Sequence, residues 1–206
     1  KEDRCHPRQM ITDRICKLMS DETRDCATRP AKVRLGDVCE MNMGQSPDSK
    51  SYNQEKRGLP FYQGNADFGV LHPSPRYWCD SPTKVADAGD ILISVRAPIG
   101  ALNIADSKCC IGRGLAALRP KDCCDLGYLY YFLRSRVGEL NTKGTGSTFK
   151  AINKNSLADT SVPLTSLVEQ KRIAAVLDRI CDLIAKRKEQ LAKLGQLVKS
   201  RFVEAA

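Results

Sequence analysis

The chain has 206 residues and a mass of 22.8 kDa, enough for one domain with an appendage or for two small domains. Apolar residues make up 42% and charged residues 28%, a balance that excludes wholesale disorder. A mean hydropathy of -0.37 and the lack of any apolar run of about twenty residues exclude a membrane span. The charged stretch from Lys1 to His6 is unlike a signal peptide, so we expect a cytoplasmic protein.

The chain is basic along its whole length. There are 33 Lys and Arg residues against 24 Asp and Glu residues, which gives a net charge of +9. Residues 1–32 contribute +2, residues 33–165 contribute +3 and residues 166–206 contribute +4. A spread of this kind indicates a folded basic surface, which favours a polyanionic partner such as nucleic acid.

The ten cysteines do not have the spacing of a structural metal site. Such sites usually show pairs separated by two to four residues, whereas the closest pairs here are the adjacent doublets Cys109-Cys110 and Cys123-Cys124. Adjacent side chains on an extended segment point to opposite faces. We therefore expect no metal site and interpret the cysteines as small buried apolar residues in a reducing compartment.

The pattern of apolar, polar and turn-forming residues divides the chain into three parts. Residues 1–32 form an N-terminal segment with one short amphipathic stretch between Met10 and Met19. Residues 33–164 alternate short apolar runs, such as Ile91–Val95 and Leu115–Leu118, with Gly, Pro, Asn and Asp clusters, which predicts short strands and long loops. A single helix from Gly127 to about Leu140 is expected to interrupt them.

Residues 165–206 predict one long helix. Ser166 and Glu169 have the spacing of a capping box at its start. The apolar residues recur at helical spacing for about forty residues, or about 60 Å, which is too long to be covered by the preceding domain. We therefore expect the helix to protrude and to pair with another helix. The residues expected to make this contact are Ile173, Leu177, Ile180, Ile184, Leu191, Leu194 and Val198.

Polar residues interrupt this apolar stripe near its middle. Arg187 occupies one stripe position and Gln190 another, one turn further on. Polar residues at such positions cost stability but can set the register and orientation of paired helices.

Sequence motifs for catalysis are weak. Gly112-Arg113-Gly114 is not followed by a long helix, as a cofactor-binding loop would be, and Gly144–Thr148 lacks the end of a phosphate-binding P-loop. Asp87 and Asp90 are better interpreted as turn and strand-start residues around Gly89 than as metal-binding carboxylates. We therefore expect no catalytic activity and no cofactor bound directly by this chain.

The loops contain residue types that suit DNA. Arg, Asn and Gln can read base edges with paired hydrogen bonds, and Lys, Ser and Thr suit phosphate oxygens. The candidate DNA contacts are Gln45, Gln63, Asn65, Arg96, Arg113, Lys143, Ser147, Thr148 and Lys150.

Several short motifs occur in an order that resembles a known family. The chain resembles one target recognition domain, followed by one spacer helix, of the specificity subunits of type I restriction-modification systems. The resemblance spans residues 33 to about 203. It is carried by Leu35–Val38, Gly44–Pro47, Leu59–Gly69, Gly89–Ser94, Ala97–Gly100, Gly144–Ile152, Val162–Leu164 and Glu169–Ala174.

This resemblance implies a fold, a function and a set of partners. The fold would be α+β, a β-rich recognition domain with long loops followed by a protruding helix that pairs as an antiparallel coiled coil. The chain would read one half of a bipartite DNA target without catalysis of its own. It would dock an adenine methyltransferase subunit, which binds S-adenosylmethionine, and a restriction nuclease subunit can join.

Complete specificity subunits of this family carry two recognition domains and two spacer helices, whereas this chain has one of each. It is therefore a natural half-subunit, for which we predict a homodimer, or a fragment of a longer chain. Two alternatives stay open: the recognition domain of a fused methyltransferase or endonuclease, and a scaffold without a DNA role.

Overall fold

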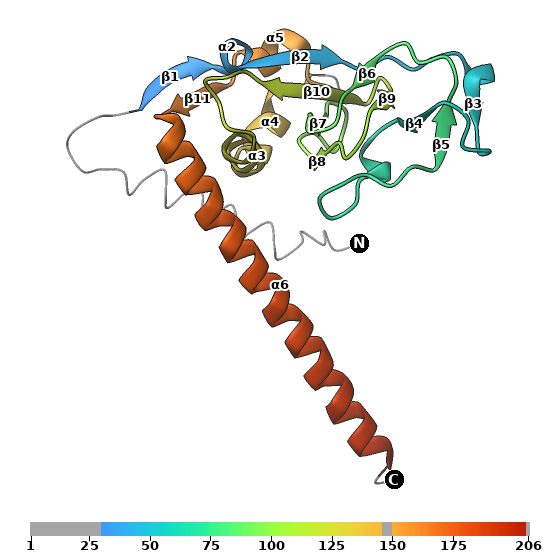
Figure 1. The fold of residues 1–206 in the computed structure, drawn as a ribbon, viewed down its shortest axis with the longest axis vertical. Helices are drawn as coiled ribbons and strands as arrows, with labels where there is room; N and C mark the ends of the chain where they lie inside the picture. The colour runs from blue at the N-terminus through green and yellow to red at the C-terminus, as the bar shows by residue number, and fades with distance from the viewer. Residues whose placement is uncertain (1–29, 146–149, 205–206) are drawn as a thin grey trace.

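The computed structural model describes residues 30–145 and 150–204, so the amphipathic stretch between Met10 and Met19 lies outside the described residues. The described part is a β-rich domain with three sheets and a long C-terminal helix, α6 (Leu167–Glu204), that extends away from it (Figure 1). This confirms the predicted α+β class and the protruding helix.

The smallest sheet closes the domain. Strand β1 (Ala31–Arg34) pairs antiparallel with β11 (Ser161–Leu164), so the two ends of the β-rich domain lie side by side. The Tyr128 hydroxyl donates a hydrogen bond to the Pro163 carbonyl, which fixes this sheet to the helices below it. α6 begins three residues after β11, so the sheet fixes the position of its first turn.

The central sheet has four antiparallel strands. Its order is β2 (Cys39–Met43), β10 (Leu115–Pro120), β7 (Ile91–Ser94) and β8 (Leu102–Ile104). All four residues of β7 are buried, because helices cover one face of the sheet and the third sheet covers the other. The strands predicted from the two apolar runs are confirmed.

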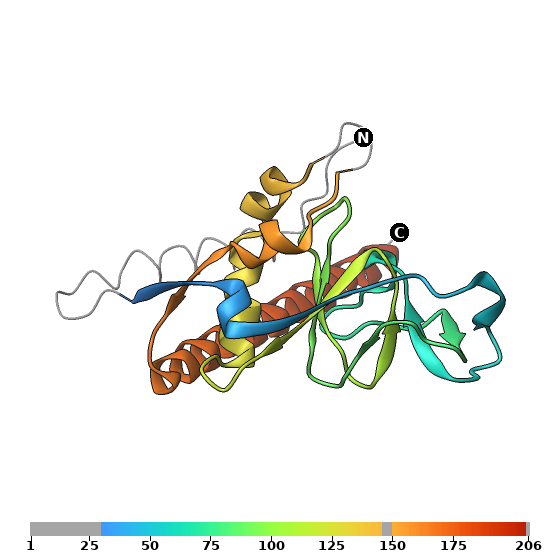
Figure 2. The same cartoon turned by 90° about the horizontal axis from the view of Figure 1, so that it is seen from above.

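The third sheet has five short strands and lies at the end of the domain away from β1 and β11 (Figures 1 and 2). Its order is β3 (Tyr52–Asn53), β5 (Tyr77–Cys79), β4 (Leu59–Tyr62), β9 (Cys109–Ile111) and β6 (Val85–Ala86); only β4 and β9 are parallel. Cys109 packs between this sheet and the central one, and Cys110 packs on the opposite side with Phe61 and Cys79. The predicted burial of this doublet on opposite faces is confirmed, whereas Cys123 of the other doublet is exposed, so the expectation of burial is wrong for that residue.

Short helices complete the domain. They are α2 (Leu35–Val38), α3 (Leu126–Ser135), α4 (Val137–Lys143), α5 (Lys154–Ala158) and the 3-10 turns η1 (Ser49–Ser51) and η2 (Asn65–Asp67).

The single helix predicted from Gly127 to about Leu140 is wrong, because α3 ends and α4 begins on either side of Arg136. The Arg136 N–H bonds to the Leu133 carbonyl at 3.0 Å, which closes α3. The new direction of α4 buries Leu140 and brings the Asn141 side chain to the Ile99 N–H at 3.2 Å. Tertiary contacts thus override a local sequence that is compatible with one helix.

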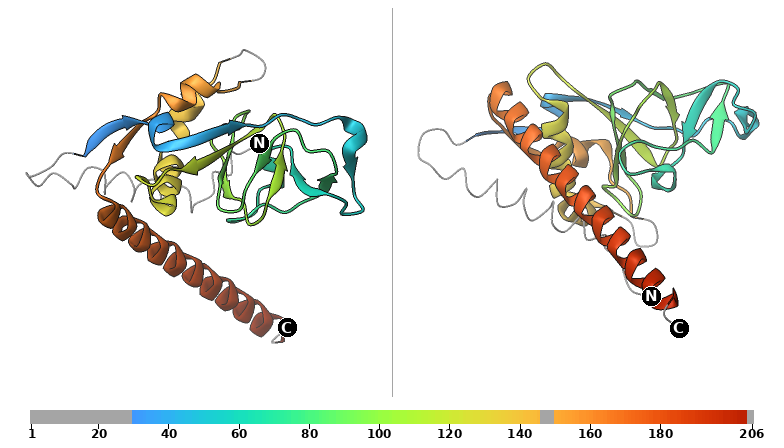
Figure 3. Two further views of the ribbon diagram at one scale, coloured as in Figure 1. Left: turned by 45° about the horizontal axis from the view of Figure 1, so that its top comes forward. Right: turned by 60° about the horizontal axis from the view of Figure 1, so that its bottom comes forward.

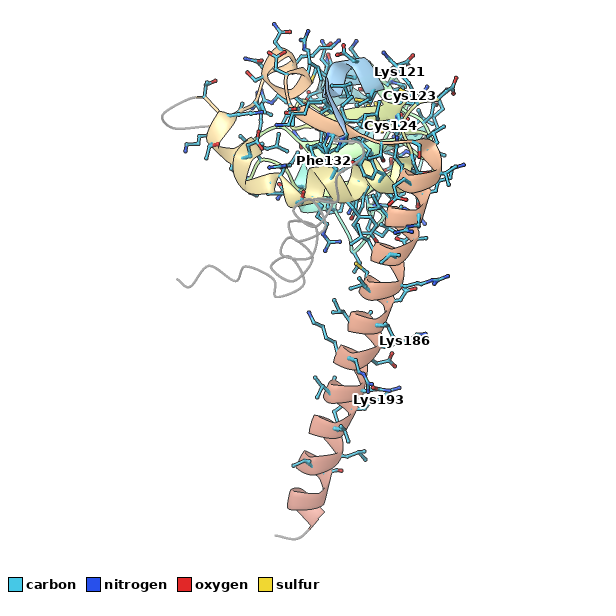
Figure 4. All side chains as sticks on the ribbon, turned by 90° about the vertical axis from the view of Figure 1, so that its left-hand side faces the viewer. Lys121, Cys123, Cys124, Phe132, Lys186 and Lys193 are labelled. Carbon is cyan, nitrogen blue, oxygen red and sulfur yellow. The ribbon has the colours of Figure 1, made fainter. Side chains whose placement is uncertain are left out.

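Helix α6 has 38 residues and is about 57 Å long. The Ser166 hydroxyl accepts a hydrogen bond of 3.3 Å from the Glu169 N–H, so the capping half of the predicted box is present. Its first four turns, as far as Cys181, pack against the domain, mainly against α3. The helix beyond Ala185 stands clear of the domain (Figures 3 and 4). None of the helices in the described ranges is long and apolar enough to cross a membrane.

Candidate nucleic-acid interface

Three loops from different parts of the sequence meet around the turn at Gly112-Arg113-Gly114. The Gly112 N–H donates to the Tyr62 carbonyl at 2.8 Å, and the Gln45 N–H donates to the Ile111 carbonyl at 3.1 Å. A Cβ atom on Gly44 would lie 2.2 Å from the Gly112 oxygen, and one on Gly114 would lie 2.5 Å from the Gln63 oxygen. Glycine is therefore required where these backbones touch, and the contact places Gln45, Gln63 and Arg113 close together.

A buried carboxylate shapes the loop that carries Gln63 and Asn65. Asp67 is only 4% exposed, and its Oδ2 accepts a hydrogen bond of 2.9 Å from the Gln63 N–H. Its Oδ1 binds Arg76, with an Nη2 to Oδ1 distance of 2.6 Å. A charge-assisted bond to a buried acceptor holds the backbone in one conformation, which leaves the exposed Gln63 side chain to project outward.

Two more candidates lie on segments that are linked to the glycine turn by backbone hydrogen bonds. The Val95 N–H donates to the Gly114 carbonyl at 2.9 Å, which brings the following Arg96 next to the glycine turn. Arg96 in turn lies opposite Ala151, and the Ala97 N–H donates to the Lys150 carbonyl at 3.1 Å. We call the resulting set the loop rim; it consists of Gln45, Gln63, Asn65, Arg96, Arg113 and Lys150.

The loop rim combines three cations with three carboxamides. Its side chains are exposed, apart from that of Asn65, which is half-buried. Cations bind phosphate oxygens, and carboxamides or guanidinium groups make paired hydrogen bonds with adenine or guanine. The arrangement can therefore both hold a DNA backbone and contact base edges.

Lys143 is not part of the loop rim. The Lys143 ammonium group is 2.9 Å from the Glu139 carboxylate and 3.4 Å from the Thr160 hydroxyl, so it is engaged within the domain. Ser147 and Thr148 lie outside the described residues.

Residues that support the rim were missed in the sequence. Tyr52 stacks on Phe61 with ring centroids 4.7 Å apart, and its hydroxyl donates to the Pro47 carbonyl at 3.0 Å. Burial raises the pKa of the Tyr52 hydroxyl. Asp67 was missed as well; its position at the end of the Gly64–Asp67 turn is the only sequence signal that points to it, and that signal is weak.

The carboxylates considered for a nuclease have a structural role. Arg119 binds Asp90 at 2.8 Å from Nε to Oδ1 and Asp87 at 2.6 Å from Nη2 to Oδ2. The Asp87 N–H also bonds to Asp90 Oδ2 at 2.9 Å across a turn in which Gly89 has a φ of +88°. The interpretation of both as turn and strand-start residues is confirmed, and the hydrogen bonds and charges of these carboxylates raise the pKa of Arg119.

The domain occupies one flank of α6 and leaves the rest open. Leu177 is 3% exposed and belongs to the domain core, while Ile173, Ile180 and Ile184 are half-buried. The Tyr131 hydroxyl donates to Asp178 Oδ1 at 2.6 Å, and burial together with this bond raises the pKa of Tyr131. Of the seven residues predicted for partner contact, Leu191, Leu194 and Val198 are exposed on the part that stands clear of the domain. Val176, Leu183 and Leu197 add to the exposed stripe.

A β-rich domain with a polar and cationic loop rim, joined to a long helix with an exposed apolar stripe, matches a known class. Residues 31–194 match the family described as the type I restriction modification DNA specificity domain. The chain belongs to this family.

Comparisons with individual relatives agree with this family. The chain is 48% identical over 155 residues to the putative type I restriction enzyme MjaX specificity subunit of Methanocaldococcus jannaschii, covering 73% of this chain and 36% of that one. It resembles the crystal structure of the HsdS subunit from Thermoanaerobacter tengcongensis, with 46% identity and a TM-score of 0.76, over 88% of this chain and 46% of that one.

A further solved chain belongs to a study of complex assembly and conformational transition of the type I R-M system. It has 46% identity and a TM-score of 0.77, over 91% of this chain and 49% of that one. The chain therefore spans about half, or less, of the length of each of these relatives.

Proposed function

We propose that this chain is a DNA-reading specificity component of a type I restriction-modification complex, and that it reads one half of a bipartite target. The observation that supports the proposal is the loop rim, where separate loops that carry three cations and three carboxamides contact one another through their backbones in a domain that belongs to this family. Lys and Arg would position the DNA backbone, and the carboxamides would read bases.

The remaining predicted DNA contacts stay part of the proposal. Ser147 and Thr148, which precede Lys150 in the sequence, would add hydroxyl groups suited to phosphate oxygens. Lys143 would reach DNA only by exchanging its ion pair with Glu139 for a phosphate.

We also propose a division of labour with other subunits. This chain would carry no catalytic group, while an adenine methyltransferase subunit would bind S-adenosylmethionine and modify the DNA; a restriction subunit would join that assembly in the cytoplasm. One of the relatives above comes from a study of complex assembly in a type I system, which supports such partners. The exposed stripe on α6 supports pairing with a second copy of the chain as an antiparallel coiled coil.

The test is a pull-down of the tagged chain from its native cells, with mass spectrometry of the bound proteins and sequencing of methylated adenines. We expect a stoichiometric adenine methyltransferase and a methylated motif that is split into two parts. Methylation of DNA by the purified chain alone, with S-adenosylmethionine added, would instead assign the activity to the chain or to a longer enzyme. A chain that binds no duplex even at low salt would overturn the DNA role.

A further inference from the structure

The exposed stripe on α6 contains one polar pair. Arg187 Nη1 donates to Gln190 Oε1 at 3.1 Å within the same helix. On either side of the pair the stripe is apolar: Leu183 is 61% exposed, Leu194 57% and Leu197 61%. Two polar side chains in the middle of an apolar contact surface require partners when that surface is covered.

Resting on the homodimer proposed above, we infer that Arg187 and Gln190 set the register in which two copies of α6 pair. The apolar stripe consists of columns of residues spaced seven apart. In an antiparallel coiled coil of two copies, a residue of one column faces a residue of another column on the second copy. Because the helices run in opposite directions, the two residue numbers of every facing pair add to the same sum. Arg187 belongs to the column that includes Ile180 and Leu194; Gln190 belongs to the column that includes Leu183 and Leu197.

One register satisfies every side chain of this central region. When Arg187 faces Gln190 of the second copy, Leu183 faces Leu194 of the second copy and Ile180 faces Leu197 of the second copy. The two-fold axis then passes between residues 188 and 189, and the polar layer occurs twice. Arg187 can donate to both Gln190 side chains, since a guanidinium group has five N–H donors and an amide oxygen accepts two bonds.

Every neighbouring register buries the polar residues against leucine or isoleucine. A slip of one heptad in one direction places Arg187 against Leu197 and Gln190 against Leu194 of the second copy. A slip in the other direction places them against Leu183 and Ile180. Because the dimer is symmetric, each slipped state buries two guanidinium groups and two amides that keep only the bond between Arg187 and Gln190 of the same helix, and their remaining donors and acceptors face apolar side chains.

The recognition domain half-buries Ile180 but leaves Leu183, Leu194 and Leu197 of this contact surface exposed. It packs against the flank of α6 that contains Gln170, Ala174 and Leu177, all of which are buried. The opposite flank carries Lys186 and Lys193, which Figure 4 shows on the part of the helix that stands clear. In the matched register these two lysines approach those of the second copy, and Glu189, which is 2.8 Å from Lys193, reduces their repulsion.

Register controls the distance between the two recognition domains. Each α6 is fixed to its own domain, so a slip of one heptad changes their separation along the coil by about 10 Å at a rise of about 1.5 Å per residue. That shift equals about three base pairs of B-DNA at about 3.4 Å per base pair. Arg187 and Gln190 are thus positioning residues for the gap between the two half-sites.

The test uses complementary variants of the full chain. In Arg187→Leu homodimers both layers pair Leu with Gln, and in Gln190→Leu homodimers both pair Arg with Leu. A heterodimer of the two variants has one fully apolar layer and one intact Arg–Gln layer. We therefore expect heterodimers to exceed the two homodimers by about tenfold when differently tagged variants are mixed and measured by native mass spectrometry.

The controls distinguish a wrong register from a wrong homodimer. Lys188→Leu mixed with Gln196→Leu alters two exposed residues outside the stripe and should give only the statistical share of heterodimers. A statistical share for the Arg187 and Gln190 variants as well would overturn the register while leaving the homodimer intact. Sedimentation of the unmodified chain as a monomer would overturn the homodimer itself, and the register with it. DNA binding by the loop rim is measured separately and depends on neither result.

Discussion

The Oε1 atom of Gln170 accepts a hydrogen bond of 2.8 Å from the backbone N–H of Asp125, across the junction between α6 and α3. The Nε2 group of the same side chain donates to the carbonyl of Cys123 at 3.0 Å and to that of Thr165 at 2.8 Å. Gln170 is fully buried, so its amide joins the start of the long helix to the loop before α3. Asp125 then caps α3 through the Tyr128 N–H at 3.0 Å, which links the orientation of both helices.

Replacement of Gln170 by alanine should lower the free energy of unfolding by about 1–3 kcal/mol, since the backbone groups of Asp125, Cys123 and Thr165 lose their buried partners. Chemical denaturation followed by circular dichroism measures the change. Gln196→Ala, on the exposed surface of the same helix, is the matched control and should change stability by less than about 0.5 kcal/mol. Equal effects of both substitutions would show that Gln170 is not the anchor of α6.

Two rim substitutions should affect DNA binding differently. Lys150→Ala should weaken binding to every duplex by a similar factor and reduce its salt dependence, because a phosphate contact carries no sequence information. Gln63→Ala should relax the preference at one base position, at a cost of about 1–3 kcal/mol on the preferred sequence. Fluorescence anisotropy against a panel of singly substituted duplexes distinguishes the two.

Lys188→Ala is the control for both, because Lys188 is exposed on α6, outside the apolar stripe and on the part of the helix that extends away from the domain. If Lys150→Ala and Gln63→Ala gave the same uniform loss, the assignment of one to phosphate and the other to a base would be wrong.

Aspartate at Leu183 and Leu194 should abolish pairing through α6. Both side chains are more than half exposed and do not contribute to the domain core, so the recognition domain should stay folded. We expect analytical ultracentrifugation to detect monomers, with an unchanged near-ultraviolet circular dichroism spectrum. Lys188→Asp introduces the same group beside the stripe and should leave the dimer intact; a double variant that still forms dimers would contradict the proposed contact.

The cysteines should differ sharply in reactivity. Burial is the main cause that raises the pKa of Cys109 and of Cys110 from 9.0 to about 12, so both stay protonated thiols at pH 8. Cys123 is exposed and should react with iodoacetamide first among the cysteines of the described ranges. Peptide mass spectrometry after brief alkylation checks the order. Early modification of the doublet in the native protein would show that the third sheet opens readily.

Much of this architecture follows from local sequence. The spacing of Ile180, Leu183, Leu194 and Leu197 is sufficient to predict a long helix with an exposed stripe, because helical periodicity is a property of neighbouring residues. The doublet Cys109-Cys110 likewise predicts opposite faces once the segment is extended. The glycines that permit the close contact of three loops are visible as motifs, although their contact is not.

Other features required the folded chain. No sequence pattern shows that Arg113 lies beside Gln63, or that Lys143 is held by Glu139, since these depend on which loops the sheets bring together. The break at Arg136 is similar: local propensity permits one helix, and the burial of Leu140 favours two.

By itself, the sequence determined the class of fold, the long helix, the family resemblance and the residue types suited to DNA, because periodicity and composition act over short distances along the chain. Tertiary structure alone decided which candidates belong to the loop rim. It also decided that Leu177 is buried in the domain core while Leu183 stays exposed. The physical reason is that burial and proximity arise from contacts between segments far apart in sequence, and the energy of those contacts is not encoded in any one segment.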